Sequence, residues 1–91
     1  MALLDLLGRR WSLRVLWELR EQPLAFRVLQ VRCEGMSSSV LSQRLAELRA
    51  AGIVERTEDG HRLSGEGERL LRALAPLNGW AERWAQRGRA Q

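Results

Sequence analysis

Residues 37–54, SSSVLSQRLAELRAAGIV, decide the fold that we expect of this chain. Leucines recur at helical spacing and form one apolar face, Leu41, Leu45 and Leu48. The opposite face is small and polar and consists of Ser39, Gln43, Ala46 and Ala50. No large side chain near the start of this helix would stop it from entering the major groove of DNA. We therefore interpret it as a DNA-recognition helix.

Both ends of this helix carry residues that are typical of helix ends. Ser37 is a natural N-cap, and Gly52 suits the left-handed position just beyond a helix. Ile53 and Val54 then change the pattern from helix to strand. The sequence therefore predicts a helix over residues 38–51 and a strand directly after it.

Two helices are predicted ahead of the recognition helix. The first covers residues 12–21, between Ser12 as an N-cap and Pro23 as a break. Its apolar side consists of Leu13, Leu16 and Trp17. The second covers residues 24–34 and is closed by Gly35. Its apolar side consists of Phe26, Leu29 and Cys33. Two helices joined by a short turn that contains glycine, with polar residues outward on the second, form a helix-turn-helix.

A short β-hairpin, which we call the wing, is predicted after the recognition helix. Its strands cover residues 53–57 and 61–63, and Asp59-Gly60 indicates a type I′ turn between them. Over residues 55–62 two arginines face three acidic residues, so this segment is net negative. Such a tip is a poor probe of the minor groove.

The two ends of the chain carry more apolar surface than a small core needs. Helices are predicted over residues 1–8 and 65–88, with Ser64 as the cap of the second. Pro76 and Gly79 should bend or interrupt that helix. We expect the terminal helices to pair with each other and with a second copy of the chain. The expected dimer interface consists of Leu3, Leu4, Leu7, Trp11, Leu74, Leu77, Trp80 and Trp84.

Length and composition limit the class of protein. Ninety-one residues suffice for one domain, and 45% hydrophobic against 29% charged residues excludes both a disordered tail and a membrane span. All fifteen basic residues are Arg and the formal charge is +4, which gives weak support for nucleic acid as a partner. The sequence shows no secretion leader, so we expect a cytoplasmic protein.

Cysteine and histidine usage limits the chemistry. One Cys and one His provide neither an internal disulfide nor a metal-ligand cluster, and the lone His has no positioned nucleophile. We therefore expect no metal, no cofactor and no enzymatic activity. The predicted fold is mainly α with a small β-hairpin (α+β), a winged helix-turn-helix that dimerises through its terminal helices. Its parts are N-terminal helices (1–22), a helix-turn-helix (24–51), the wing (53–63) and a dimerisation helix (65–88), all in one domain over residues 1–91.

This order of elements resembles the HxlR-type winged helix-turn-helix regulators, which are relatives of the MarR group. The resemblance spans nearly the entire chain, and its central run is specific. It rests on LLGRRWSL at residues 6–13, LAF at 24–26, VLSQRLAEL at 40–48, GIVER at 52–56 and LS at 63–64, with Gly67 and Trp80. The resemblance implies a bacterial transcription regulator that is dimeric through its terminal helices. It also implies two recognition helices in successive major grooves of a pseudo-palindromic operator.

Three features depart from the family pattern. The resemblance does not include the cysteine that members often carry ahead of the first helix, which some use to sense oxidants or electrophiles. The wing loop is short, because only residues 58–60 separate the predicted strands. Val28 and Val31 stand at positions that are commonly polar in the family, and they predict an exposed apolar strip that would suit a protein partner.

The residues that we expect to contact double-stranded DNA lie on three elements. They are Ser37, Ser38, Ser39, Ser42, Gln43 and Arg44 on the recognition helix, Arg27 on the helix before it, and Arg56 and Arg62 on the wing. The Gln43 carboxamide can bond adenine at two atoms, the serines can reach bases or phosphates, and the arginines suit phosphates. Arg49 would hold a phosphate or pair with an acidic residue. For each residue the alternative is an ordinary solvated surface.

Several residues allow a plain and a functional interpretation. We expect Cys33 to be a small buried hydrophobe rather than a redox sensor, and His61 to be a solvated turn residue. The tryptophans suit the core and the dimer interface, and the alternative is an aromatic pocket for a small-molecule effector between the terminal helices. The alternative function for the whole chain is a winged-helix protein-interaction module that has lost DNA binding.

Overall fold

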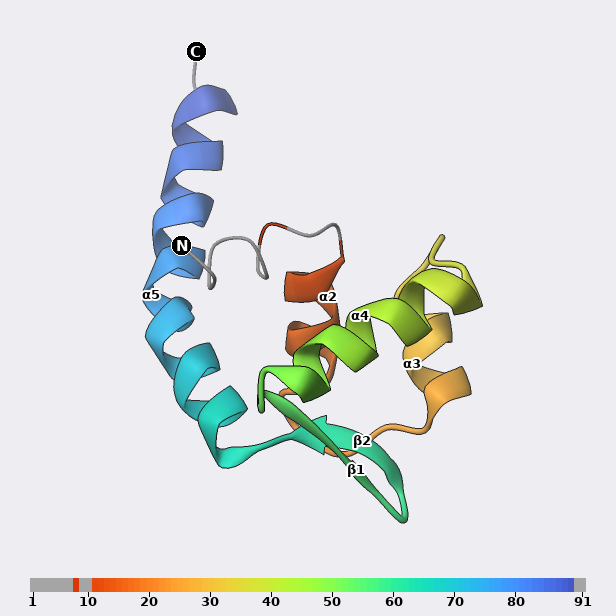
Figure 1. Cartoon of the computed structure of the whole chain (residues 1–91). Helices are drawn as coiled ribbons and strands as arrows, with labels where there is room; N and C mark the ends of the chain where they lie inside the picture. Colours follow the sequence, from red (N-terminus) through yellow and green to blue (C-terminus); the bar gives the residue numbers. More distant parts are fainter. Residues whose placement is uncertain (1–7, 9–10, 90–91) are drawn as a thin grey trace.

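Four helices and one β-hairpin make up the computed structural model over the residues that it describes, Gly8 and 11–89 (Figure 1). In chain order they are α2 (Ser12–Glu18), α3 (Phe26–Arg32), α4 (Ser38–Ala50), β1 (Val54–Thr57), β2 (Gly60–Leu63) and α5 (Gly65–Arg89). The predicted class, mainly α with a small hairpin in a winged helix-turn-helix, is confirmed. The helix predicted over residues 1–8, including Leu3, Leu4 and Leu7 of the expected dimer interface, lies outside the described residues except for Gly8.

The recognition helix α4 forms as its sequence predicts. The Ser37 hydroxyl caps it by accepting a hydrogen bond from the Val40 amide at 3.2 Å. Its buried face consists of the three predicted leucines, Leu41, Leu45 and Leu48. Gly52 takes the expected left-handed conformation beyond the helix, with φ of 76°. The local signals at both ends agree with the apolar face, so neighbouring elements do not shift this helix.

Helix α2 differs from the prediction at both ends and in its buried face. Its N-cap is Trp11, which has a left-handed φ of 80°, and Ser12 is the buried first residue of the helix rather than its cap. The helix ends at Glu18, well before Pro23. Just beyond its end, the backbone amide and the guanidinium of Arg20 both donate to the Trp17 carbonyl, at 3.2 and 3.0 Å.

The core uses a neighbouring stripe of α2 instead of the predicted one. Val15, Leu16 and Leu19 are buried, whereas Leu13 and Trp17 are 50% and 44% exposed. Of the expected apolar side of α2, only Leu16 therefore belongs to the core, and Trp17, which was expected in the core or the dimer interface, is not part of the core. Both stripes of α2 are apolar, so its sequence alone does not show which one faces α4. The stripe with Leu13 and Trp17 lies beside α5 instead.

Helix α3 is shorter than predicted because the chain before it pairs with the wing. Leu24 does not enter the helix: its amide and carbonyl exchange two hydrogen bonds of 2.9 Å with the backbone of His61. The helix begins only at Phe26. Leu29 and Cys33 are buried as expected, and Phe26 is half-buried against the core. The bridge adds a third extended segment to the two-stranded hairpin.

The wing turn is not of the predicted type. Thr57 pairs with Gly60, so the turn residues are Glu58 and Asp59. A type I′ turn needs positive φ at both central residues, and among the described non-glycine residues only Trp11 has positive φ. Gly60 supplies the unusual conformation instead, with φ of 125°, and a Cβ there would overlap the Leu24 carbonyl. The turn is therefore adapted to the bridge between Leu24 and His61.

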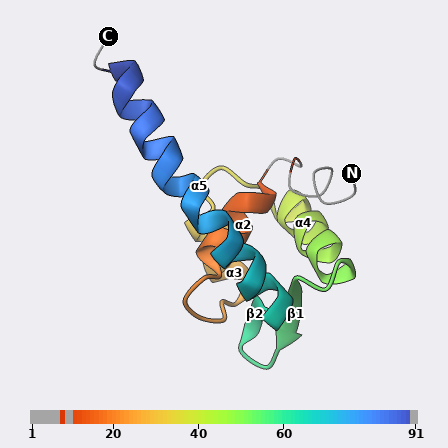
Figure 2. The ribbon, with the colours of Figure 1, turned by 90° about the vertical axis from the view of Figure 1, so that its left-hand side faces the viewer.

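Helix α5 begins on the body of the molecule and then extends beyond it. Its first half packs against α2 and β2, and the rest projects away from all other described elements (Figure 2). The predicted cap is confirmed, because the Gly67 amide donates to Ser64 Oγ at 3.1 Å. Pro76 and Gly79 do not interrupt the helix, which was expected to bend or break there. Pro76 is exposed, so water can satisfy the carbonyl that loses its helical partner.

Candidate DNA-binding surface

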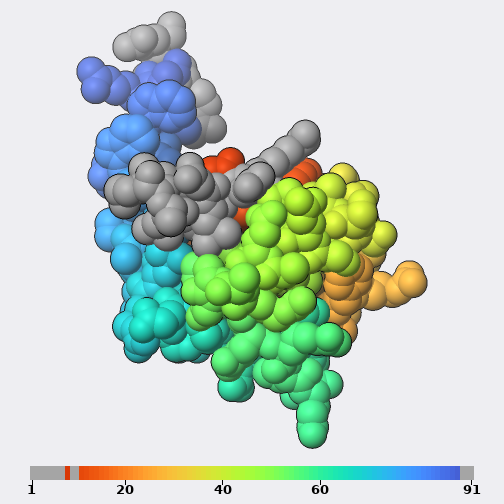
Figure 3. Space-filling model, in the orientation of Figure 1, coloured from red at the N-terminus to blue at the C-terminus, as the bar shows by residue number. Residues whose placement is uncertain are grey.

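The polar face of α4 lies on the outside of the molecule, with the wing projecting beside it (Figure 3). The predicted serines and Gln43 are all exposed on it, and the set is Ser37, Ser38, Ser39, Ser42 and Gln43. They lie toward the N-terminal end of a helix of 13 residues, where unpaired amides and the helix dipole favour an anion such as a phosphate. This face presents short hydroxyl groups and one carboxamide, and its core side is held by buried leucines.

Arg44 is placed differently from the other predicted contact residues. Its side chain is mostly buried, and its guanidinium forms an ion pair of 2.8 Å with Glu47 on the next turn. The Arg44 Nε atom is buried without a hydrogen-bond partner. The guanidinium therefore lies along α4 rather than pointing outward, and contact with a phosphate would require the pair with Glu47 to open.

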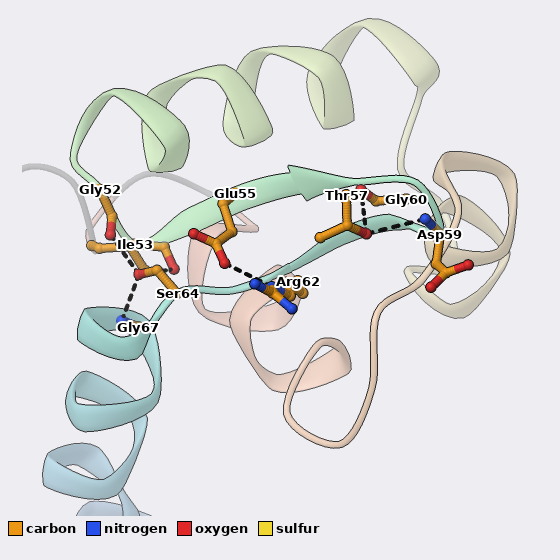
Figure 4. A network of polar contacts seen from close by, with 9 residues as sticks. All are labelled: Gly52, Ile53, Glu55, Thr57, Asp59, Gly60, Arg62, Ser64 and Gly67. Atoms are coloured by element: carbon orange, nitrogen blue, oxygen red, sulfur yellow. Dashed lines mark hydrogen bonds and ion pairs between the residues drawn. The ribbon is translucent and has the colours of Figure 1, made fainter.

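The three other arginines predicted to hold phosphates are exposed, but their charges are not equally available. Arg62 on β2 pairs with Glu55 on β1 at 2.6 Å (Figure 4). Arg56 has no ion pair within the described part of the chain, and neither has Arg27 in the first turn of α3. The available positive charge of this surface is thus concentrated at Arg27 and Arg56.

A network of polar contacts joins the wing to α5 (Figure 4). Ser64 Oγ lies within hydrogen-bond distance of the Gly52 and Ile53 carbonyls, and its own amide donates to the Ile53 carbonyl at 2.9 Å. At the tip, the Asp59 amide donates to Thr57 Oγ1 at 3.2 Å. These contacts fix the base and the turn of the wing, so the hairpin emerges from the body in a defined direction.

His61 is not the solvated turn residue that the sequence predicted. It is only 6% exposed, and its Nε2 lies 3.1 Å from Nη1 of Arg49 on α4. Burial lowers the pKa of His61, and the positive charges of Arg49 and Arg56 lower that pKa further. Arg49 therefore contacts an imidazole, where we expected a phosphate or an acidic residue. Alternation with buried Leu63 was the available sequence signal, because the two residues share one sheet face.

Cys33 and the valines of α3 lie where the sequence placed them. Cys33 is fully buried, and burial raises the pKa of its thiol, which disfavours the reactive thiolate. Val28 and Val31 are exposed on α3, as the predicted apolar strip requires. Within the described residues, no cluster of His, Cys, Asp and Glu side chains could hold a metal ion. Nor is any described helix long and apolar enough to span a membrane.

The described residues of the predicted dimer interface fall into two groups. Trp11 is half-buried and packs against the core, whereas Leu77, Trp80 and Trp84 are exposed on the projecting part of α5. The indole rings of Trp80 and Trp84 are stacked, with centroids 6.0 Å apart. Leu74 lies lower on α5 and lines an apolar groove of about 360 Å³ between α2 and α5, together with Leu13, Leu16, Trp17 and Leu71.

These elements define a winged helix-turn-helix protein, and the chain belongs to the HxlR-like helix-turn-helix family, whose model matches residues 6–89. The members are transcriptional regulators and not enzymes. An uncharacterized HTH-type transcriptional regulator of Bacillus subtilis, YvaP, is 28% identical over 87 residues, which cover 88% of this chain and 81% of YvaP.

Solved structures agree with this assignment. The quinone-bound YodB of B. subtilis is similar with a TM-score of 0.84 and 28% identity, covering 90% of this chain and 93% of that one. A possible HxlR family transcriptional factor of Thermoplasma volcanium is similar with a TM-score of 0.82 and 25% identity, covering 91% of this chain and 81% of that one. A MarR family regulator of Enterococcus faecalis is similar with a TM-score of 0.84 and 27% identity, covering 97% of this chain and 86% of that one.

Proposed function

We propose that this chain is a sequence-specific DNA-binding transcriptional regulator that binds a pseudo-palindromic operator as a homodimer. The exposed polar face of α4, held outward by its buried leucines, carries the proposal. The family assignment supports DNA as the partner. The rival function, a protein-interaction module without DNA binding, is motivated by the exposed Val28 and Val31 and by the paired charges of the wing. The family assignment does not favour this rival.

Within this proposal the contact residues have separate roles. Gln43 reads base edges in the major groove, and the serines at the start of α4 contact bases or phosphates. Arg27 and Arg56 hold phosphates, because they are exposed and have no ion pair among the described residues. Arg44 and Arg62 contribute only when DNA replaces Glu47 and Glu55 as their partners.

The homodimer is supported by an apolar seam along α5. Its members are spaced alternately four and three residues apart, the pattern of helices that pair side by side, and they are Leu70, Leu74, Leu77, Ala81 and Trp84. The upper members are exposed, so the described part of one chain leaves them in water. A second copy would cover them and would place a second α4 at a fixed distance for the other half-site.

A small-molecule effector is the remaining part of the proposal. The groove between α2 and α5 is apolar, holds about 360 Å³ and lies beside the helix that we assign to dimerisation. A similar structure, YodB, is known with a bound quinone. An apolar ligand in this groove would change the angle of α5 and thereby the distance between the two recognition helices.

The roles of Gln43 and Arg56 can be separated by measuring binding to duplexes of different sequence. Gln43→Ala should reduce the preference for the native duplex over a scrambled one by about tenfold, because one base contact is worth roughly 1–3 kcal/mol. Arg56→Ala should weaken binding to both duplexes alike and reduce the dependence on salt. If Gln43→Ala leaves the preference intact, α4 does not read bases through this residue.

A further inference from the structure

His61 joins the three parts of the DNA-binding surface. Its backbone pairs with Leu24 ahead of α3, its strand belongs to the wing, and its side chain contacts Arg49 in the last turn of α4. We propose that His61 is a positioning residue, which holds the wing against the recognition helix only while its imidazole is neutral, and that DNA binding is therefore sensitive to pH. This inference rests on the proposed function.

The contact with Arg49 determines which nitrogen of the imidazole carries the proton. A guanidinium has only donors, so at 3.1 Å the Nε2 atom of His61 must accept from Arg49 Nη1. The proton of the neutral ring then lies on Nδ1, which is buried without a hydrogen-bond partner in the structure. The geometry thus requires one specific tautomer, and a second proton can be added only at the atom that accepts from Arg49.

Protonation of His61 would remove this contact and replace it with repulsion. The charged groups that bear on the ring are Arg49 from α4 and Arg56, its direct cross-strand partner on β1. Arg56 and His61 share the sheet face on which Val54 and Leu63 are buried. A buried imidazolium would therefore face two guanidinium groups, and moving the wing away from α4 would relieve the conflict.

The consequence for DNA follows from the position of Arg56. We assign Arg56 to a phosphate, and its place relative to Gln43 depends on how the wing lies against α4. A wing that moves from α4 would place Arg56 where it can hold a phosphate only with α4 out of register with the base edges, so binding to the native sequence weakens more than binding to a scrambled one. Added positive charge alone would strengthen attraction to any DNA and leave the preference unchanged. A fall in the preference on acidification therefore distinguishes positioning from simple charge.

The test measures the affinity of the protein for the promoter DNA beside its own gene and for a scrambled duplex, and the ratio of the two is the preference. The preference is compared between about pH 7.5 and about pH 5 at constant ionic strength. For the unaltered chain we expect the preference to fall severalfold, and by at most about tenfold per pH unit because one proton is involved. The preference of His61→Gln should show no such fall, because a carboxamide can accept from Arg49 but does not titrate. A preference that rises or stays constant in the unaltered chain would overturn the proposal.

Arg49→Met provides a second variant, should His61→Gln fail to fold. It removes the donor and keeps a long apolar side chain at a half-buried position. Its preference should already be reduced at neutral pH and should fall less on acidification than that of the unaltered chain. A preference that falls as steeply as in the unaltered chain would show that the Arg49 contact is not the one that protonation removes.

Imidazole NMR of the unaltered chain separates failure of this inference from failure of DNA binding. The chain has one His, so the imidazole signals belong to His61. We expect Nε2 without a proton at neutral pH, and weaker protection of the Leu24 and His61 amides, relative to the intrinsic exchange rate at each pH, once the ring is protonated. A proton on Nε2 at neutral pH, or protection that stays constant, would overturn the proposal. If the chain binds neither duplex, the proposed function fails. The imidazole signals still show whether His61 accepts from Arg49 and whether its protonation releases the wing.

Discussion

The body of the molecule and the projecting part of α5, residues 77–88, differ in how their apolar side chains are covered. In the body, the three leucines of α4 are between 0% and 1% exposed, and hydrogen bonds join the wing to three other segments. On residues 77–88, Leu77, Trp80 and Trp84 are 59%, 56% and 65% exposed. The body thus presents α4 without help, whereas the end of α5 has apolar surface that the other described residues leave uncovered. The following predictions test this difference.

The largest contrast should come from two leucine truncations. Leu45→Ala removes a buried side chain from α4 and should lower the free energy of unfolding by about 3 kcal/mol, with a range of roughly 2–5. Leu77→Ala should change it by less than about 0.5 kcal/mol at concentrations where the chain is monomeric. Urea unfolding at low and high protein concentration measures both. Equal losses for the two variants in the monomer would mean that the end of α5 already belongs to the core.

Two glycine substitutions should change the free energy of unfolding in opposite directions. Gly60→Ala places a Cβ against the Leu24 carbonyl at a φ of 125°, so we expect a loss of about 2 kcal/mol. Gly79→Ala lies inside α5, where a Cβ meets only Arg83 at an ordinary distance, and should stabilise that helix by about 0.5–1 kcal/mol. Thermal unfolding followed by circular dichroism compares them. Tolerance of Gly60→Ala would contradict the close approach of wing and Leu24.

The dependence of stability on pH should arise in the body. The pKa of His61 is lowered in the folded state, so the unfolded chain binds more protons as the pH falls below the ordinary value of 6.5. Stability should therefore be fully present above that value and decrease until the pH reaches the folded-state pKa. His61→Gln should flatten the profile over this range. Urea titrations at several pH values measure the effect. A free energy of unfolding that increases on acidification would contradict the lowered pKa of His61.

The smallest expected signal is the reactivity of Cys33. Its burial and raised pKa should make alkylation at neutral pH much slower than in the unfolded chain, because the thiol must first be exposed. Leu45→Ala should accelerate the reaction, and Leu77→Ala should leave it unchanged. Mass spectrometry of timed samples follows the adduct. Rapid labelling of the native chain would show that the body opens far more easily than its packing indicates.

Local signals were sufficient to predict the recognition helix. Its leucine spacing, the cap at Ser37 and the glycine at position 52 all concern neighbours in sequence, and they agree with one another. The same reasoning identified Ser64 as a cap. It also placed Cys33 in the core and Val31 on the surface. Each of these features depends on a few adjacent residues, which is why the sequence contains enough information to find them.

The errors concern contacts between distant segments. The pairing of Leu24 with His61 shortened α3 and determined the wing turn, and no pattern within either segment reveals it. Helix α2 has two apolar stripes, so only the position of α4 decides that Val15 rather than Leu13 is buried. The contact between Arg49 and His61 joins two elements that are distant in sequence, so neither segment alone predicts it. Burial of His61 could have been predicted from its alternation with Leu63.

The number of protein chains on one operator duplex is the measurement that tests this account most directly. Sedimentation equilibrium of the labelled promoter duplex with excess protein, at low salt, should give two chains per duplex at saturation. Trp80→Ala combined with Trp84→Ala should weaken the binding of the second chain, while Gln86→Ala, an exposed polar residue on the same turn, should not. A saturated complex with one chain, or no complex at all, would contradict a dimer that presents two recognition helices.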